Sequence, residues 1–520
     1  MSKMLKSSGA MGLATMMSRI LGMIRVMVYA RFMGDTWVAS AFFFAFQVPN
    51  LFRRLLGEGA LSAALVPILK EKEVKDGEQT MWEAANVALS MLVCLCTVIV
   101  GILILGTSLV LWYGGAGLKA MLFLELLRVM SPYVLMVCGA AVLMGLCNAR
   151  GFFFIPALGS TLLNVVMIWA VLFLAPRMGA TLDEQVFGLA IGVLIAGFFQ
   201  MIFQFPVLVR QGFTPKFIAP WKHPFTQDIL GRFLPGVVGV AAFQINVLLT
   251  TWIGYHHADY IVASFEFAVR LMELPQGVIG VSLATFLLPA LSGLAAEKKF
   301  PEFRKTLKEG MGYVIFANLP ASIFMFVLAE PIVRLLFERG AFDAAATFRC
   351  QYALKCLVPG LVAFSLVNVC ARAFFALGDV KTPMRISVFC LATNVILAFQ
   401  LIPVFQQGGM GMANTASSFL NLGLLIYALR RKFTRLTFED MRRSIFSVTT
   451  TAVFASLLAW GSSLGIESVF GNQSLLARLM GVFIPLGLAS VVYFGLSLWL
   501  RIPAASEVWL LLKSKLDRTP

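Results

Sequence analysis

Apolar residues fill this chain in runs of about 20, and short gaps rich in Gly, Pro, Lys and Arg separate the runs. A helix of that length crosses the roughly 30 Å hydrocarbon core of a bilayer. The runs recur from end to end, and the gaps leave no room for a soluble domain. The pattern predicts an all-α integral membrane protein of about 14 transmembrane helices. The expected spans are 8–32, 37–69, 83–112, 122–148, 154–175, 186–209, 229–254, 259–293, 310–336, 345–376, 384–404, 411–430, 446–465 and 476–500.

The second span, 37–69, is too long for one straight crossing, because a helix of that length would reach about 50 Å. Proline and glycine are the usual causes of a sharp helix bend. We therefore expect this span to bend at Pro49, Gly57 or Gly59.

Lys and Arg are concentrated in alternate gaps, and this sets the expected orientation. Cytoplasmic loops of membrane proteins carry the excess of basic residues, here in gaps such as 70–75, 210–232, 298–308 and 430–443. With an even number of spans, both termini are expected in the cytoplasm. The first span lacks a small-residue cleavage site and is expected to be retained rather than removed as a signal peptide. The formal charge of +16 then reflects topology, and its dispersal over loops disfavours a nucleic-acid partner.

Composition agrees with a membrane protein and points to no metal or cofactor. Hydrophobic residues make up 59% of the chain and charged residues 13%, with a mean hydropathy of +0.86. The eight cysteines fall within predicted helices without paired ligand spacing, and the three histidines have no carboxylate or thiolate spaced to join them. We predict that the cysteines are packing residues and that the protein holds neither a metal nor a cofactor.

The two halves of the chain share an internal repeat. The prolines at 132 and 156 recur 227 residues later, and segment 65–69 resembles segment 287–291. The matches pair spans 2, 4 and 5 with spans 8, 10 and 11, so the halves are predicted to be parallel six-helix repeats. Two such lobes around a midplane site are typical of transporters in which one lobe rocks against the other. The expected domains are 1–228 (first lobe and cytoplasmic linker), 229–432 (second lobe) and 433–520 (two extra transmembrane helices and a cytoplasmic tail).

Arginines recur inside the predicted spans. Arg19, Arg25, Arg53 and Arg54 lie in the first two, and Arg270 lies in the eighth. Charge at membrane depth costs at least about 2.5 kcal/mol per group, so it is retained where it faces protein, water or a ligand. Because a guanidinium is a planar donor suited to phosphate oxygens, the arginines predict an anionic substrate in a central cationic cavity. Interhelical ion pairs or side chains that snorkel to the interface are the alternatives.

The segments around these charges are similar to motifs of one transporter family. The similar segments are 18–25, 41–43, 49–54, 57–67, 270–281, 287–292 and 335–343. On them the chain resembles the MurJ/MviN lipid II flippases of the MOP transporter superfamily. The resemblance implies movement of an undecaprenyl-diphosphate-linked peptidoglycan precursor, lipid II, from the inner to the outer leaflet of the bacterial cytoplasmic (inner) membrane by alternating access. Such a role belongs to cell-wall biogenesis and cell shape.

The resemblance also implies the substrate-binding residues and the partners. In the family, charged residues line the cavity, and a groove on the two extra helices is thought to take the lipid tail. The positions of this chain that match the cavity residues are Arg19, Arg25, Arg53, Arg54, Glu58, Arg270 and Glu273. Lipid II, membrane lipids and the cell-wall synthesis machinery are the candidate partners.

The chain departs from the family pattern at three acidic positions. Val26, Ser40 and Val269 stand where many relatives have Asp, so the cavity is expected to be more positive than usual. Glu266 lies one helical turn before Arg270, on the same face. We predict that Glu266 substitutes for the missing acid beside Arg270, the alternative being a solvated carboxylate at the outer interface.

Two other functions compete with this interpretation. A related MOP-type exporter of another lipid-linked oligosaccharide, or of a drug, differs only in motif detail. A membrane glycosyltransferase would need a catalytic carboxylate or metal in a substantial extramembrane loop. The best candidate for such a loop is 337–344 with Glu338 and Asp343, and it looks more like a turn with an interfacial cap.

Overall fold

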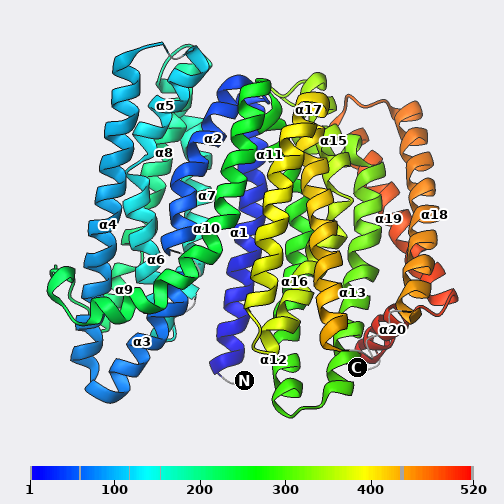
Figure 1. Cartoon of the computed structure of the whole chain (residues 1–520). Coiled ribbons are helices and arrows are strands. Elements are labelled where there is room, and N and C mark those ends of the chain that lie inside the picture. Colours follow the sequence, from blue (N-terminus) through cyan, green and yellow to red (C-terminus); the bar gives the residue numbers. More distant parts are fainter. Residues whose placement is uncertain (1–2, 58–59, 116, 153, 434–438, 517–520) are drawn as a thin grey trace. The chain divides into compact units, whose positions relative to one another are not determined.

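The computed structural model describes residues 3–57, 60–115, 117–152, 154–433 and 439–516, and these ranges contain helices and turns but no strand. Figure 1 shows the helices in chain order. The first ten are α1 (Lys3–Met33), α2 (Trp37–Phe52), α3 (Ala60–Asp76), α4 (Glu78–Tyr113), α5 (Leu118–Met130), α6 (Tyr133–Ala149), α7 (Phe154–Trp169), α8 (Leu182–Ile202), α9 (Phe205–Arg210) and α10 (Phe225–His257). The others are α11 (Ile261–Pro275), α12 (Ser282–Ala296), α13 (Phe300–Val327), α14 (Ala329–Phe337), α15 (Ala344–Leu357), α16 (Gly360–Ala376), α17 (Lys381–Lys432), α18 (Glu439–Phe470), α19 (Leu475–Trp499) and α20 (Pro503–Leu516).

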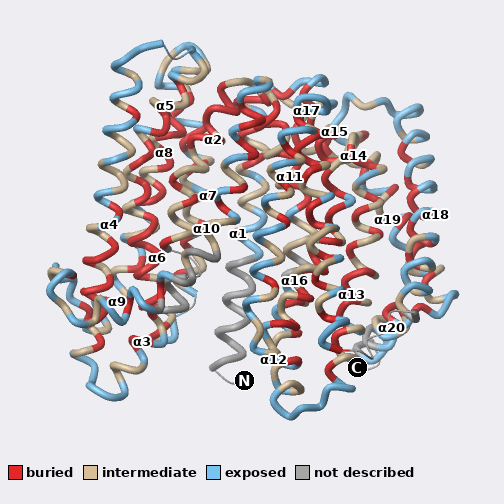
Figure 2. The backbone as a smooth tube through the Cα atoms, viewed as in Figure 1, coloured by how far each residue is buried: buried red, intermediate tan, exposed pale blue. Residues whose placement is uncertain are grey.

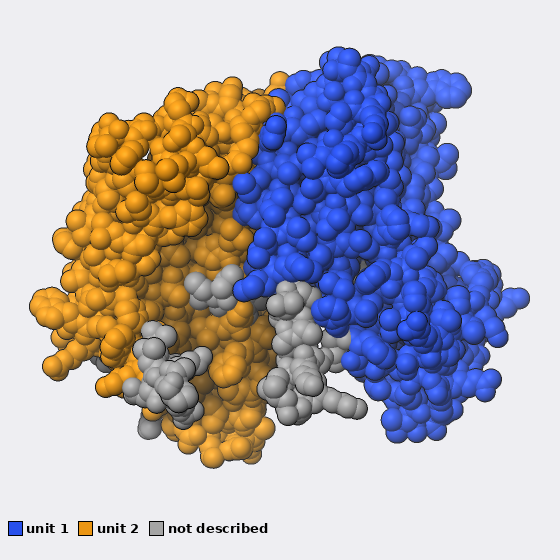
Figure 3. All heavy atoms as spheres, turned by 180° about the vertical axis from the view of Figure 1, so that it is seen from behind, with its two compact units in different colours: residues 1–255 blue, residues 256–520 orange. Residues whose placement is uncertain are grey.

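The chain divides into two compact units, Met1–Tyr255 and His256–Pro520, which we call unit 1 and unit 2 (Figure 3). Nearly all of α10 is grouped with unit 1. The repeat placed the boundary between lobes ahead of this helix, at 228/229, and the predicted domain limits stay a prediction.

The described helices confirm an all-α membrane protein. Seven of them are long and apolar enough to cross a bilayer, or up to nine spans if each of two bent pairs is one span. The seven are Glu78–Tyr113, Phe154–Arg177, Leu182–Arg210, Phe300–Val327, Lys381–Lys432, Met441–Phe470 and Leu475–Trp499. Helices α1 and α11, which carry candidate arginines, are outside this set, and the count of 14 spans stays a prediction.

Helices α18 and α19 of unit 2 expose large apolar side chains and bury small ones. On α18 and α19, Phe446 and Val491 are 71% and 73% exposed, whereas Ala459 and Ala489 are fully buried (Figure 2). Hydrocarbon solvates the outer side chains, so close packing of small residues is what holds such helices together.

The prolines of the predicted repeat coincide with helix breaks. Pro132 precedes α6 where α5 and α6 meet at 42°, and Pro359 precedes α16 where α15 and α16 meet at 43°. A second pair of breaks is π-helical: η1 (Arg53–Gly57) follows α2, and η5 (Gln276–Val281) follows α11. Of the expected bend points of the second span, Pro49 lies inside α2, Gly57 ends η1 and Gly59 lies outside the described residues, and the bend itself stays a prediction.

Helix α17 is two antiparallel helices joined by a sharp turn. Gln406 has φ 50° and ψ −127°, which is not helical. Asn394 Nδ2 donates to Ser417 Oγ over 3.0 Å, although a straight helix would separate these residues by about 34 Å. Gly409 fits against the Leu401 carbonyl, where a Cβ would lie 2.4 Å from the oxygen. The turn separates the expected spans 384–404 and 411–430.

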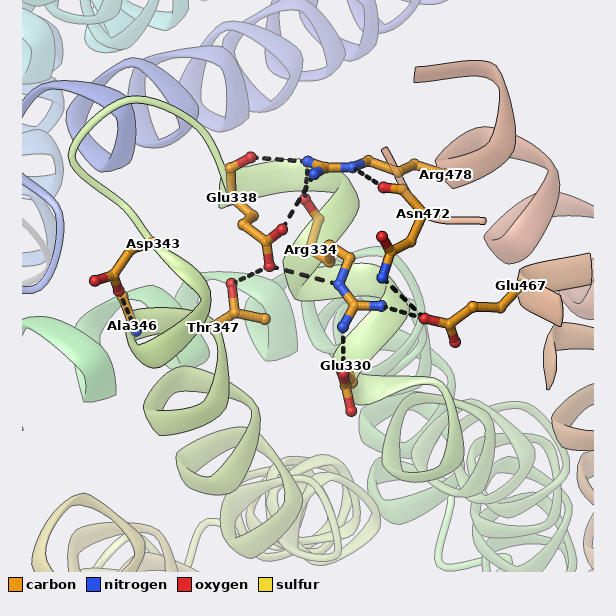
Figure 4. A network of polar contacts seen from close by, with 9 residues as sticks. All are labelled: Glu330, Arg334, Glu338, Asp343, Ala346, Thr347, Glu467, Asn472 and Arg478. Carbon is orange, nitrogen blue, oxygen red and sulfur yellow. Dashed lines mark hydrogen bonds and ion pairs between the residues drawn. The ribbon is translucent and has the colours of Figure 1, made fainter. Parts of the chain in front are cut away.

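An ion-pair network fastens the loop between α18 and α19 to the rest of unit 2 (Figure 4). Arg334 pairs with Glu330 on its own helix, with Glu467 at 3.0 Å and with Glu338 at 3.5 Å. Arg478 donates to the Glu338 carboxylate over 3.1 Å and to the Glu338 carbonyl over 2.8 Å. The two arginines and Glu338 are each less than one fifth exposed, so water screens the two pairs made by Glu338 only weakly.

The same network accounts for the carboxylates of the 337–344 loop. Asp343 Oδ1 accepts from the Ala346 N–H over 2.7 Å and caps α15 (Figure 4). Glu338 accepts from Thr347 Oγ1 over 2.9 Å as well as from both arginines. These contacts form a turn in which Asp343 caps α15 and Glu338 is a structural ion-pair partner.

The two ends of α17 are held together by one ion pair. Lys432, the last residue of α17, pairs with Asp379, which precedes its first turn. Asp379 also accepts from the Thr382 N–H and hydroxyl over 3.0 and 2.8 Å. The hydrogen bond from Lys432, aided by those from Thr382, lowers the pKa of Asp379 from 3.8 to about 2.

This depressed pKa predicts a pH dependence of stability. The contribution of Asp379 is complete above about pH 4 and is lost as the pH falls through about 2, because the unfolded state binds the proton more readily. We expect Asp379→Asn to lower the thermal unfolding midpoint in detergent at pH 7. Between pH 4 and pH 2, the midpoint of this variant should fall less than the midpoint of the unaltered protein. Glu507→Gln, an exposed position on α20, is the control. An Asp379→Asn midpoint equal to that of the unaltered protein at pH 7 would contradict the prediction.

Candidate functional site

Arg19 and Arg25 project from α1. Arg19 is exposed, whereas Arg25 is half-buried and its guanidinium carbon lies 5.6 Å from the centre of the Tyr29 ring, one turn along the helix. Tyr29 in turn packs edge-on against Phe42 of α2, with the ring centres 6.0 Å apart. A cation over an aromatic face is stabilised by roughly 0.5–2 kcal/mol, depending on desolvation. The aromatic contact thus orients Arg25 without neutralising it.

Arg53 and Arg54 lie in the π-helical turn η1, and both are half-buried. Arg53 Nε donates a 2.7 Å hydrogen bond to Asn50 Oδ1, one turn earlier. The widened turn also leaves the Phe52 carbonyl within 3.7 Å of the Cys138 thiol on α6. π-Helical turns occur frequently at functional sites. Glu58, another predicted cavity residue, lies outside the described residues.

Arg270 forms ion pairs with two carboxylates of its own helix, α11. Its Nη1 donates to Glu273 over 2.8 Å and its Nη2 to Glu266 over 3.4 Å. The Glu266 side chain is 18% exposed, compared with 46% for Glu273 and 37% for Arg270. The structure thus brings the three predicted residues of unit 2 together, with Glu266 turned toward Arg270. Their role toward a substrate stays a prediction.

The three positions where the family's acids are absent face the interior of their units. Val269 packs against an apolar cluster that includes Met272, Leu357 and Leu361. Val26 and Ser40 are 6% and 0% exposed. A carboxylate at position 269 would therefore lie against apolar side chains, and it would not be equivalent to Glu266.

Asn50 is the residue that sequence reasoning missed. The available signal was its position three residues before Arg53, which on a helix places the two side chains on one face. Arg53 and Arg270 are consequently held in different ways. Arg53 donates to a neutral amide, whereas Arg270 donates to two carboxylates, which compete with any anion for it.

Within the described ranges, no three His, Cys, Asp or Glu side chains are placed to hold a metal ion. An open cavity of about 410 Å³ in unit 1 lies away from the candidate residues. Its lining is Trp37, Leu118, Met121, Leu122, Glu125, Met178, Asp183, Glu184 and Phe187.

Comparison with known proteins identifies relatives along almost the whole chain. The profile of the family described as "Lipid II flippase MurJ" matches residues 29–480. The "Probable lipid II flippase MurJ" of Vibrio cholerae is 30% identical over 516 residues, which covers 96% of this chain and 97% of that protein. The "Lipid II flippase MurJ" of Burkholderia cenocepacia is 29% identical and covers 93% and 95%.

Solved structures show the same fold. A lipid II flippase MurJ in an inward closed conformation superposes with a TM-score of 0.77 at 21% identity, covering 94% of this chain and 98% of that one. An inward-facing multidrug resistance transporter of the MATE family, in the MOP superfamily, superposes with a TM-score of 0.66 at 15% identity, covering 82% and 99%. At these identities the structures establish the fold, and the family profile establishes the relationship. This chain belongs to the MurJ family of lipid II flippases.

Proposed function

We propose that this protein moves lipid II from the inner to the outer leaflet of the bacterial cytoplasmic membrane. The observation that carries the proposal is the family match over residues 29–480, which includes the two π-helical turns beside Arg53 and Arg270. A flippase is a transporter and not an enzyme, so the site has to bind and release its substrate without breaking a bond.

The arrangement of arginines suits a lipid-linked diphosphate. Its head group cannot cross hydrocarbon and its tail cannot leave it, so it needs a cationic path that stays open to lipid. Arg25 lies over the ring of Tyr29 and Arg53 donates to Asn50, so these contacts help to orient both guanidinium groups. We assign them to capture of the diphosphate, because a guanidinium binds phosphate oxygens bidentately.

Arg270 has a different part in this mechanism. When the site is empty, Glu266 and Glu273 neutralise its charge. An arriving diphosphate displaces these carboxylates, and they displace the diphosphate when it leaves. Reversible exchange of this kind lets the substrate bind without being trapped.

Orientation and partners follow from the same proposal. The basic gaps support an orientation with both termini in the cytoplasm and the network of Arg334 and Arg478 on the outer side. The immediate partners are lipid II and the surrounding lipids, and the cell-wall synthesis machinery would use the exported precursor.

Export of a drug or of another lipid-linked oligosaccharide is the second candidate function. The likeness to the multidrug transporter, at 15% identity, supports only the shared fold. The curated relatives described above are named as lipid II flippases, which favours the first function.

The first test removes the proposed substrate contacts. We expect Arg25→Ala, Arg53→Ala and Arg270→Ala each to reduce lipid II translocation in proteoliposomes at least tenfold, with normal insertion, because each removes a ligand to the diphosphate. Arg385→Ala, an exposed arginine elsewhere on α17, is the control and should be active. Full activity of all three site variants would refute the assignment.

A second test addresses the carboxylate exchange. Glu266→Gln should slow flipping several-fold without weakening lipid II binding, since it removes a competitor of the substrate for Arg270. Glu309→Gln, whose partner Lys305 lies at 4.0 Å, serves as the matched surface control. Weaker binding, or an unchanged flipping rate, would argue against the exchange.

The third test concerns orientation. A cysteine at Lys298 should be shielded from impermeant thiol reagents in intact cells, whereas one at Gln473, exposed between α18 and α19, should be labelled. Gly408, in the turn within α17, is a less suitable labelling position. It packs so closely on Tyr352 that an added Cβ would lie 2.4 Å from the ring. The chain with its eight native cysteines gives the background, and labelling of position 298 from outside would overturn the topology.

A further inference from the structure

Asn318 of α13 is an unusual polar residue inside unit 2. Its side chain is 0% exposed, and neither its Nδ2 nor its Oδ1 has a hydrogen-bond partner in the described part of the chain. A buried amide without partners is strongly destabilising, so native proteins satisfy such groups with protein atoms or with bound water. Ser365 of α16, also 0% exposed, has an unpartnered hydroxyl as well.

Contacts of α13 on one side place Asn318 beside the π-helical turn η5. Gly310 of α13 lies against Leu287 of α12, where an added Cβ would be 2.4 Å from the leucine side chain. Asn318 follows Gly310 by eight residues on α13. Gly280, in η5, precedes Leu287 by seven residues. At 1.5 Å per residue, both lie roughly 11 Å from this contact in the same direction, because α12 and α13 run antiparallel.

Contacts on the other side place Ser365 at the same junction. Gly280 approaches Ser365 so closely that an added Cβ would lie 2.5 Å from its hydroxyl oxygen. Ser322, one turn beyond Asn318 on the same face of α13, donates to the Val358 carbonyl at the start of α16 over 2.9 Å. Asn318, Ser365 and the backbone of η5 therefore meet within about one helical turn.

The chemistry of these groups selects the ligand. An amide offers a donor and an acceptor, and a hydroxyl offers both as well. A cation would satisfy only the oxygens, an anion would satisfy only the hydrogens, and the groups named here carry no charge. Water donates and accepts, and buried waters typically make about three such bonds. We propose that Asn318 and Ser365 bind ordered water beside η5.

The position of this water gives it a role in the proposed function. A π-helical turn has backbone hydrogen bonds that differ from those of the α-helices around it. Water beside η5 can replace those bonds one at a time, so that the helix carrying Arg270 can bend without leaving a backbone group unsatisfied in a hydrocarbon environment. This role rests on the proposed flipping activity, whereas the water site itself does not.

The water site can be tested without any transport assay. A high-resolution structure of the unaltered protein should show density within hydrogen-bond distance of Asn318 and Ser365, and Asn318→Leu, which keeps the side-chain shape, should abolish it. Absence of that density, or a direct bond from the Asn318 amide to a protein atom, would overturn the proposal.

Thermal unfolding separates water from a protein partner or a cation. Asn318→Leu should leave the unfolding midpoint unchanged or raise it, because an apolar group replaces a polar one whose only partner was water. Asn394→Leu, the matched control, breaks the bond to Ser417 and should lower the midpoint by several degrees. An equal loss in both variants would indicate a protein partner for Asn318. A midpoint that rises with Na⁺ only when Asn318 is present would indicate a cation instead of water.

Flipping in proteoliposomes tests the role in bending. Asn318→Leu should slow lipid II translocation several-fold at normal stability, with Ser365→Ala changing the rate in the same direction. Translocation at the normal rate in both variants would refute the role in bending. If the unaltered protein fails to move lipid II, the proposed function fails, and the density and unfolding results still decide the water site.

Discussion

Polar groups inside hydrocarbon have to find partners within the protein, and this constraint shapes the structure at every scale. It closes the backbone into helices, and it makes each interruption of a helix depend on a specific contact. At η1 the Phe52 carbonyl meets the Cys138 thiol, and the neighbouring Arg53 is held by Asn50. Where the helix pair inside α17 packs together, Asn394 reaches Ser417.

The interruptions recur in the two halves of the chain. Prolines 132 and 359 stand at bends of 42° and 43°, and π-helical turns follow α2 and α11. Candidate charges sit at both π-helical turns: Arg53 and Arg54 within η1, and Arg270 with Glu273 just before η5. A break is a suitable place for a ligand-binding charge, because the local backbone already departs from a closed helical ladder. The repeat thus supplies two related positions that have acquired different chemistry.

The difference between the two positions lies in how the charge is held. A neutral acceptor fixes the direction of Arg53, and an aromatic ring does the same for Arg25. Arg270 instead shares its helix with two carboxylates within 3.4 Å. In the proposed mechanism, the carboxylates that compete with the substrate for Arg270 favour its release. The family relationship supplies the substrate class, and these contacts supply a physical route for handling it.

Much of the architecture was predictable from the sequence. Apolar runs of about 20 residues indicated a membrane protein. The arginines inside these runs, which carry a substantial free-energy cost, indicated a polar interior. The 227-residue displacement of the prolines indicated the internal repeat, and the motifs around Arg25, Arg53 and Arg270 pointed to the correct family. Helical spacing alone also placed Glu266 on the face of Arg270, because residues four apart on a helix are neighbours whatever surrounds them.

Other features depended on the tertiary structure. The apolar surroundings of Val269, the fastening of Asp379 to Lys432 and the unsatisfied amide of Asn318 involve residues far apart in the chain. The ion-pair network gives Glu338 a structural role. It joins Arg334 and Glu338 to Glu467 of α18 and Arg478 of α19, more than 100 residues later. A sequence states which side chains share one helical face, because that depends on local periodicity. The partner that each face meets is decided by how helices pack, and that depends on the whole chain at once.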